Sequence, residues 1–312
     1  FKELQYLSNI DYKPIRYISF AHDEETYKAL EASKAWSKAE MIAPKQFREE
    51  ISPYFNANPK KYISALVSED CWQATPGKVV DLVRNLGIAA GGTVMEDCRV
   101  LEACREGKYT SVLVQTHDKK YVEYRTEHFV NALGSGAGKL CDSMGIDAGL
   151  YPVRHQAFIT RRLPMLGKHG TNLDMLIDRQ DYKGFSAVYG QQIAYTGQII
   201  GCASPKLDAM RIDKNLKVNT KAFLEIVSEM FSEWIPDLAG VGIQAVWAGY
   251  YTEPRYIVDP ELGLFVGMRG HGFMLSQYIA RMYVDKLLGR PVPEYFEKLK
   301  LNGPGLSEKA FK

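Results

Sequence analysis

Gly267-Met-Arg-Gly-His-Gly-Phe-Met274 guides the interpretation of the whole chain, because it places three glycines around one histidine directly before a helical pattern. Residues 264–266 before it predict a short buried strand, and residues 275–288 after it predict a helix. A glycine turn at a helix start exposes backbone N–H groups at the positive end of the helix dipole, and it lets a flat ligand lie against the main chain. Two interpretations follow: a ligand-binding turn, or a tight strand-to-helix turn with a hydrogen-bonded His271.

A second motif lies upstream and precedes the glycine turn in a set order. The run Trp247-Ala-Gly-Tyr-Tyr-Thr-Glu-Pro-Arg-Tyr-Ile-Val-Asp259 is followed by Gly263-Leu-Phe-Val-Gly267. In order, spacing and residue type these segments resemble the C-terminal signature of the D-amino-acid oxidase / glycine and sarcosine oxidase family of FAD-dependent oxidoreductases. The resemblance implies a flavoenzyme that binds FAD.

Composition gives no support for a nucleic-acid-binding, membrane or metal-binding protein. The 312 residues can bury a large core in two domains, and 39 basic against 37 acidic residues give no reason to expect nucleic acid or an anionic membrane as a partner. No apolar run approaches the ~18 residues of a membrane span, and no signal peptide opens the chain. The five cysteines form no C-x-x-C pair, so we expect free thiols, no metal site and a cytoplasmic location.

Local patterns predict the secondary structure. Strands are expected at 17–20, 99–104, 109–116, 121–124, 127–131, 175–178 and 186–201. Helices are expected from Asp23 to about Ala39, with Leu30 and Trp36 as core contacts, and over 76–87, where Gly87 ends the helix, 139–144 and 219–237. The apolar stripe of the last of these helices predicts core packing, and the tail after Gly289 is expected to be a surface extension.

Two more segments extend the resemblance toward the N-terminus. Ala132-Leu-Gly-Ser-Gly-Ala-Gly138 follows an expected strand like the family's N-A-x-G-x-x, and Tyr151-Pro-Val-Arg-His-Gln156 resembles its P-V-R-x-Q. The resemblance implies an α/β fold with a GR2-type FAD-binding domain, assembled from discontinuous segments, and a substrate domain with a mixed, largely antiparallel sheet. The substrate domain would take residues 1–70 and 151–246, and the FAD-binding domain 71–150 and 247–290, with 291–312 as a tail.

One element of the family does not occur in the sequence. The family opens with a strand and G-x-G-x-x-G, which hold the AMP half of FAD, and no such spacing of glycines is found here. We therefore expect either a shortened copy of a longer protein or one half of a split enzyme whose partner chain carries this unit. The sequence as given is not expected to hold FAD tightly alone.

The resemblance also assigns residues to the cofactor. Those expected near FAD are Ala132, Gly134, Gly136, Gly249, Gly267, Gly270, His271, Gly272 and Phe273. Certain sarcosine oxidases attach flavin to a cysteine in the segment that matches 248–252, and this chain has Gly249 there, which implies a non-covalent flavin. His271 lies near the flavin ring by resemblance, or it fixes the turn through a backbone hydrogen bond; we do not assign it as a general base.

The expected substrate-binding residues are Tyr250, Tyr251, Arg255, Arg269 and Met274. Met274 stands where the same enzymes have a lysine that holds the substrate carboxylate, and a thioether cannot do so. Arg255 and Arg269 are the replacement candidates, because a guanidinium binds a carboxylate through two hydrogen bonds. Either arginine could instead be a surface group paired with Asp259 or Glu253. The tyrosines could wall the substrate pocket or pack a domain seam.

The expected reaction is hydride transfer to flavin N5 from a small amino acid or secondary amine, such as glycine, an N-methyl amino acid, proline or a D-amino acid. Two alternatives stay open. One is a 2-hydroxy-acid or glycerol-phosphate dehydrogenase of the same superfamily, and the other is a non-catalytic subunit of a flavoprotein complex. Whether the chain forms a homo-oligomer or binds a partner subunit is also left open.

Overall fold

The computed structural model describes residues 1–168, 171–180, 185–193, 195–205, 216 and 220–305. The strands are β1 (Lys13–Ala21), β2 (Ala39–Ile42), β3 (Ser64–Gln73), β4 (Arg99–Glu106), β5 (Tyr109–Gln115), β6 (Tyr121–Thr126), β7 (Tyr151–Thr160), β8 (Met175–Asp178), β9 (Phe185–Gln192), β10 (Ile199–Pro205), β11 (Ile243–Glu253), β12 (Ile257–Asp259) and β13 (Leu264–Val266). The α-helices are α1 (Lys2–Leu7), α2 (Glu24–Ser33), α3 (Phe47–Glu50), α4 (Pro76–Ala89), α5 (Ala137–Ser143), α6 (Thr220–Trp234) and α7 (Gly272–Leu287). Short 3₁₀ turns include η3 (Gly134–Gly136), η6 (Arg269–His271) and η7 (Glu294–Leu299).

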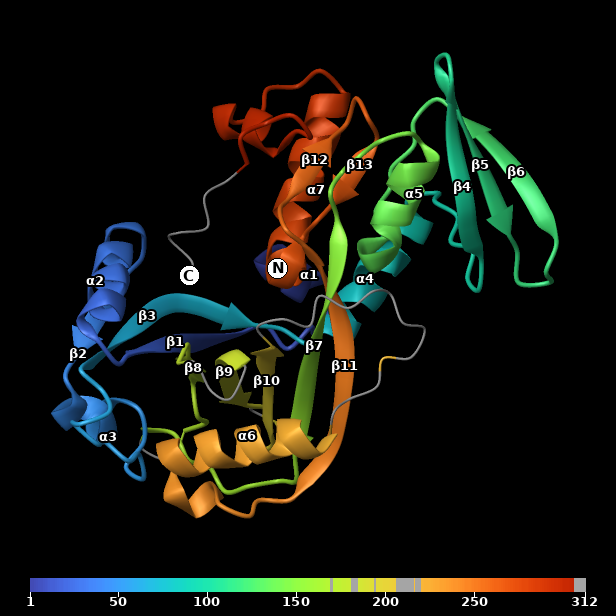
Figure 1. Ribbon diagram of the computed structural model, residues 1–312. Coiled ribbons are helices and arrows are strands. Elements are labelled where there is room, and N and C mark those ends of the chain that lie inside the picture. Colours follow the sequence, from blue (N-terminus) through green and yellow to red (C-terminus); the bar gives the residue numbers. More distant parts are fainter. Residues whose placement is uncertain (169–170, 181–184, 194, 206–215, 217–219, 306–312) are drawn as a thin grey trace.

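An eight-stranded sheet organises the molecule, in the order β11-β7-β10-β9-β8-β1-β3-β2. Every neighbouring pair is antiparallel except β1 and β8, which confirms the expected α/β fold with a mixed, largely antiparallel sheet. A three-stranded sheet, β4-β5-β6, projects beside α5 at the far end of the molecule, and β12 and β13 pair near α7 (Figure 1). The division into domains stays a prediction.

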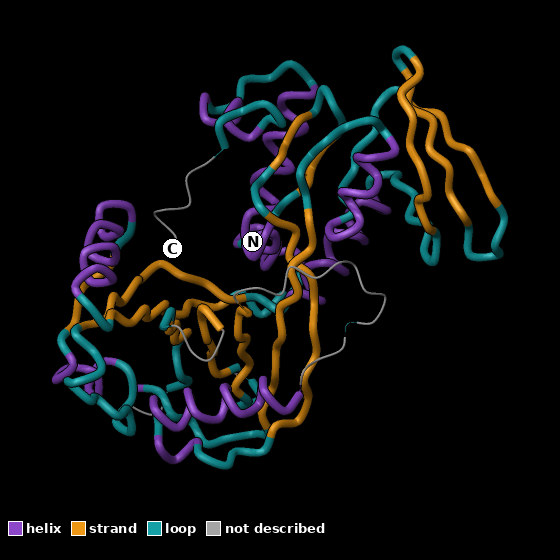
Figure 2. The backbone as a smooth tube through the Cα atoms, in the orientation of Figure 1, coloured by secondary structure: helices purple, strands orange, loops and turns teal. Residues whose placement is uncertain are grey.

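Helix α6 covers one face of the large sheet (Figures 1 and 2). Its sequence repeats apolar side chains at helical spacing, and this stripe is buried as expected: Phe223, Ile226, Val227, Met230, Phe231 and Trp234. The stripe packs on sheet residues that include Phe158, Val188 and Ile199. Within the described residues, no helix combines the length and the apolarity needed to cross a bilayer.

Two glycines make room for the rings of this core. Gly190 and Gly201 are register partners in β9 and β10. A Cβ on Gly190 would lie 2.8 Å from Phe231 Cζ, and one on Gly201 would lie 2.7 Å from Phe158 Cζ. The bare backbone at this pair therefore lets both aromatic rings lie directly on the sheet.

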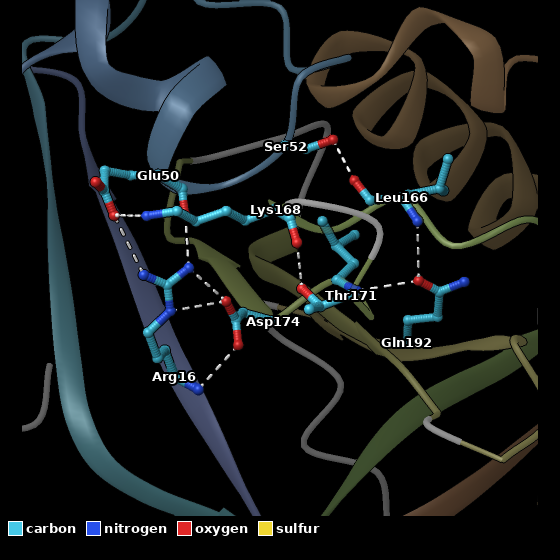
Figure 3. A network of polar contacts seen from close by, with 9 residues as sticks. Arg16, Glu50, Ser52, Leu166, Lys168, Thr171, Asp174 and Gln192 are labelled. Carbon is cyan, nitrogen blue, oxygen red and sulfur yellow. Dashed lines mark hydrogen bonds and ion pairs between the residues drawn. The ribbon is translucent and has the colours of Figure 1, made fainter.

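A polar network fixes the segment that leads into β8 (Figure 3). Arg16 of β1 donates to Asp174 at 2.9 and 2.8 Å and pairs with Glu50 at 3.4 Å. Lys168 donates to the same Glu50 carboxylate at 3.1 Å, and Gln192 Oε1 accepts the N–H groups of 166 and 173. These bonds hold the segment that leads into β8 in place.

Several local expectations are confirmed. Asp23 caps α2 by accepting the Thr26 N–H at 2.7 Å, and Leu30 is buried. The predicted strand at 264–266 and the helix after the glycine turn are β13 and α7. The expected contact of the Trp36 side chain and the expected start of α6 at Asn219 lie outside the described residues.

Other expectations are wrong for identifiable reasons. Helix α2 ends at Ser33, where a 3₁₀ turn over Lys34–Trp36 follows it before β2, and α4 continues two residues past Gly87. The range 127–131 is not a strand; Asn131 alone forms a bridge, to Leu264 of β13. The range 186–201 is two strands with a turn between them. The tail does not simply cover the surface, since its Phe296 and Leu299 are buried against β12 and α7.

Candidate active site

The glycine turn between β13 and α7 is pressed against two other segments. Gly267 has a φ of +71°, and a Cβ there would overlap the Arg255 carbonyl oxygen. A Cβ on Gly270 would lie 2.8 Å from the Tyr251 ring. The turn therefore needs glycine both for its backbone conformation and for its approach to β11.

Helix α7 starts at this turn without a side-chain cap. Its N-cap residue, His271, makes no capping hydrogen bond, so no N-cap side chain occupies the N–H groups of the first turn. Phe273 and Met274 in that turn are 38% and 48% exposed. A sixteen-residue helix with this start presents both N–H donors and the positive end of its dipole.

The side chain of His271 bonds to a tyrosine. Its Nδ1 lies 2.6 Å from the Tyr256 hydroxyl. Burial lowers the pKa of His271, and the nearby positive charges of Arg269 and Arg179 lower it further. The imidazole is therefore mainly neutral at pH 7. The proximity of His271 to a flavin stays a prediction.

The two arginines expected to bind substrate both have partners within the chain. Arg269 Nε forms an ion pair with Glu253, and both side chains are 16% exposed. Arg255 donates from Nη1 to the Gly303 carbonyl at 3.1 Å and from Nη2 to the Leu301 carbonyl. Arg269 thus shows the pairing with Glu253 that the sequence left open, while the guanidinium of Arg255 binds the tail.

A cluster of aromatic side chains lies on the sheet face opposite α6. The rings of His155 and Tyr251 are 3.9 Å apart between centroids, and the Tyr189 and Tyr251 hydroxyls are 3.3 Å apart. Burial lowers the pKa of His155 to about 4 and raises the pKa of both tyrosines. All three side chains are uncharged at pH 7, so we name them the neutral aromatic patch. Tyr250, next along β11, lies on the other face of the strand by alternation.

His155 is a site residue that the sequence motifs did not single out. It occupies the variable position of the P-V-R-x-Q match and is the register partner of Gly249. The alternation of side chains along β7 could have indicated the face of His155, because the buried Gln156 and Phe158 mark the core face and leave His155 on the other.

The expected cofactor segment at 132–138 lies against the same strand. Both η3 and η6 contact β11. The buried Asn131 shapes the loop, donating to the Ala137 carbonyl at 3.0 Å and accepting the Leu133 N–H at 3.2 Å. A Cβ on Gly134 or Gly249 would meet nothing within 4 Å.

Strand β11 therefore brings the predicted cofactor residues together from segments far apart in the sequence. Gly134 and Gly136 lie in η3, Gly270 and His271 lie in η6, and both turns contact β11, the strand that contains Gly249. Met274 follows on α7 with an exposed side chain, so the structure places it next to this group without giving it a polar role.

The chain is similar to a known protein family and to several solved structures. A family model described as FAD dependent oxidoreductase matches residues 1–286. Among curated proteins the sequence search finds no match. One similar solved structure is L-proline dehydrogenase from P. horikoshii, with 23% identity, a TM-score of 0.76 and coverage of 96% of this chain and 79% of that one. Another is glycine oxidase from Geobacillus kaustophilus, with 16% identity, a TM-score of 0.75 and coverage of 96% of this chain and 78% of that one. L-alpha-glycerophosphate oxidase from Mycoplasma pneumoniae, with FAD bound, has 16% identity, a TM-score of 0.73 and coverage of 91% and 77%. At these identities the likeness shows the fold alone.

Proposed function

The chain belongs to the family of FAD-dependent oxidoreductases, and we propose on that premise that it oxidises the C–N bond of a small amino acid or secondary amine. Glycine, N-methyl amino acids, proline and D-amino acids are the candidate substrates. The observation that carries the proposal is the meeting of the glycine turn at α7 with the neutral aromatic patch on one face of the sheet.

The residues present fit FAD. Gly134 and Gly249 leave open space where a side chain would stand, so a flat ring could lie against the backbone. The uncapped start of α7 offers N–H donors and positive potential to the electron-rich N1 and O2 edge of a flavin. Gly249 supplies no thiol for attachment, which supports a non-covalent cofactor. When bound, FAD supplies the hydride acceptor at N5.

The chain's own groups have defined tasks in this proposal. The first turn of α7 holds the cofactor edge, and Tyr251 packs against Gly270 and positions the turn. The neutral aromatic patch provides a surface with low polarity, which disfavours the charged form of an amine and leaves its lone pair available. Neither His155 nor His271 is an imidazolium at pH 7, since burial lowers the pKa of both.

An anaerobic titration of the intact protein, loaded with FAD, tests the proposal, because the sequence as given is not expected to hold FAD tightly alone. Amino acids and their matched 2-hydroxy acids are added in pairs, such as glycine with glycolate and D-alanine with D-lactate, while the visible absorbance of oxidised flavin is followed. Bleaching by an amine and not by its hydroxy acid is the expected result. Protein that holds FAD but is bleached by none of the amines would refute amine oxidation.

A second candidate is oxidation of a hydroxy acid or of glycerol phosphate. The likeness in fold to the Mycoplasma pneumoniae glycerophosphate oxidase supports its inclusion. Bleaching by a 2-hydroxy acid or by glycerol 3-phosphate, with the amines silent, would select it. A non-catalytic subunit of a flavoprotein complex is the remaining alternative, and the absence of bleaching by any compound would favour it.

The location and assembly stay proposals. The described cysteines are all free thiols, which supports a reducing compartment such as the cytoplasm. A homo-oligomer or a partner subunit is compatible with the fold, and the molar mass in solution distinguishes the two from a single chain.

A further inference from the structure

The chain continues beyond the part that matches the family, and this continuation folds back toward the candidate active site. The family model ends at residue 286, whereas the structure describes the chain to residue 305. Residues 294–303, which we name the tail clasp, consist of η7 and the turn after it. The tail clasp lies against β12, close to α7 (Figure 1).

The first half of the tail clasp is anchored by buried apolar side chains. Phe296 and Leu299 are 0% and 1% exposed, and they belong to one apolar cluster with Tyr256 and three residues of α7. Tyr256 is the residue whose hydroxyl lies 2.6 Å from Nδ1 of His271, at the N-cap of α7. The tail clasp therefore packs with the same residue that contacts the side chain of the N-cap.

The second half of the tail clasp supports both segments that are expected to contact the cofactor. Leu301 packs against another apolar cluster, which includes Val266 and Ala137. Val266 ends β13 directly before the glycine turn, and Ala137 begins α5 directly after η3. The apolar contacts of the tail clasp thus reach the supports of the glycine turn and of the loop at 132–136.

Arg255 joins the tail clasp to the glycine turn. Its guanidinium donates from Nη1 to the Gly303 carbonyl at 3.1 Å and from Nη2 to the Leu301 carbonyl. Its own carbonyl oxygen lies so close to Gly267 that a Cβ there would overlap it. Because the two backbones are in contact, a shift of the Arg255 carbonyl must move the first residue of the turn.

Other polar contacts of the tail clasp are weaker than those of Arg255. Lys300 donates to Glu261 at 2.9 Å, but the Glu261 side chain is 72% exposed, so this pair contributes little to stability. The Leu301 N–H donates to Asp259 at 3.4 Å, which is a long contact. The charge-assisted hydrogen bonds of the partly buried Arg255 are therefore the main polar attachment.

We infer that the tail clasp is part of the cofactor site and that Arg255 is a positioning residue, which holds the glycine turn and the start of α7 in the arrangement that receives FAD. This inference rests on the proposed function and deepens it, because it adds residues outside the matched family region to the same site. It also gives Arg255 a role that requires no contact with substrate.

Amide hydrogen exchange over residues 268–278 tests the inference on the intact protein, before and after loading with FAD. Arg255→Ala should speed exchange in this segment about 10-fold or more, because two charge-assisted hydrogen bonds to the tail are lost. Arg255→Lys should recover part of the protection, since an ammonium group reaches fewer acceptors than a planar guanidinium. Arg281→Ala, on α7 with a side chain that is 81% exposed, is the matched control and should exchange like the wild type.

The flavin supplies a second readout. We expect Arg255→Ala to weaken FAD binding about 10-fold and to make the midpoint potential of the bound flavin more negative, because displaced N–H donors at the start of α7 stabilise the reduced flavin less. A purely structural role for the tail clasp would leave the potential unchanged.

Two results would overturn the inference. One is faster exchange in Arg255→Ala that is confined to 294–303, with the exchange at 268–278 and the FAD affinity unchanged. The other is exchange that rises equally in 268–278 and in β7, since the variant would then be destabilised as a whole and Arg255 would have no specific effect on the turn.

The two proposals fail in different ways. If an amine bleaches the flavin and Arg255→Ala changes neither the exchange at 268–278 nor the FAD affinity, amine oxidation stands and the role of the tail clasp is refuted. If no amine bleaches the flavin but Arg255→Ala speeds exchange in the turn and weakens FAD binding, the positioning role stands and amine oxidation is refuted.

Discussion

The two faces of the eight-stranded sheet are built from the same strands but serve different purposes. One face is closed by α6 over apolar rings such as Phe158, and the other carries the neutral aromatic patch beneath the glycine turn. The contrast is clear along β7, where Phe158 is fully buried on the core face and His155 stacks on Tyr251 on the other. Since a slip of one residue would exchange the faces, the apolar core sets the register that places the polar groups of the site.

The largest loss of stability is expected from a substitution on the sheet face that α6 covers. Phe158→Ala should lower the free energy of unfolding by about 3 to 5 kcal/mol, because the fully buried ring leaves a cavity between the sheet and α6. Urea unfolding measures this loss. Trp247 is the matched control from the other face, one residue along the paired strand and 42% exposed, and Trp247→Ala should cost far less. Equal losses in the two variants would contradict the distinction between the faces.

An intermediate effect is expected at the edge of the closed face, and it should depend on pH. His22 Nδ1 faces the Lys61 carbonyl and Nε2 faces Asp178, each at 2.8 Å, so both ring nitrogens face acceptors and the ring is best satisfied when protonated. Burial lowers the pKa of His22, but the bond and charge of Asp178 outweigh it and the net pKa is raised above 6.5. A raised pKa contributes stability that is complete below 6.5 and is lost as the pH rises through the folded-state value.

His22→Gln should therefore cost roughly 2 kcal/mol at acidic pH, the scale of a hydrogen bond between charged groups, and less at pH about 9. Unfolding in urea at both pH values gives the two losses. Glu40→Gln, which neutralises an exposed carboxylate on β2, serves as the control for general charge effects. A loss that grows with pH would have the wrong sign and would show that His22 is neutral in the folded protein.

The sequence predicted what local patterns can encode. The stripe of α6, the Asp23 cap and the glycine turn before α7 depend on neighbouring residues, and each was found where expected. Strand β3 was missed because its second half is largely polar and partly exposed. The neutral aromatic patch could not be found from the sequence, because His155, Tyr189 and Tyr251 are brought together only by the register of three strand pairs.

The smallest effect on stability, and the most specific one, is expected within the neutral aromatic patch. Tyr189→Phe removes one hydroxyl from its 3.3 Å contact with Tyr251 but keeps both rings and the register. Because the contact is long, we expect a change of at most about 1 kcal/mol in unfolding free energy. The same change should alter turnover several-fold, since the rotation of Tyr251 against Gly270 would be less restricted. Urea unfolding and steady-state kinetics separate the two quantities. A large loss of stability with unchanged turnover would contradict this expectation. It would show that the hydroxyl pair stabilises the fold, as the apolar core under α6 does.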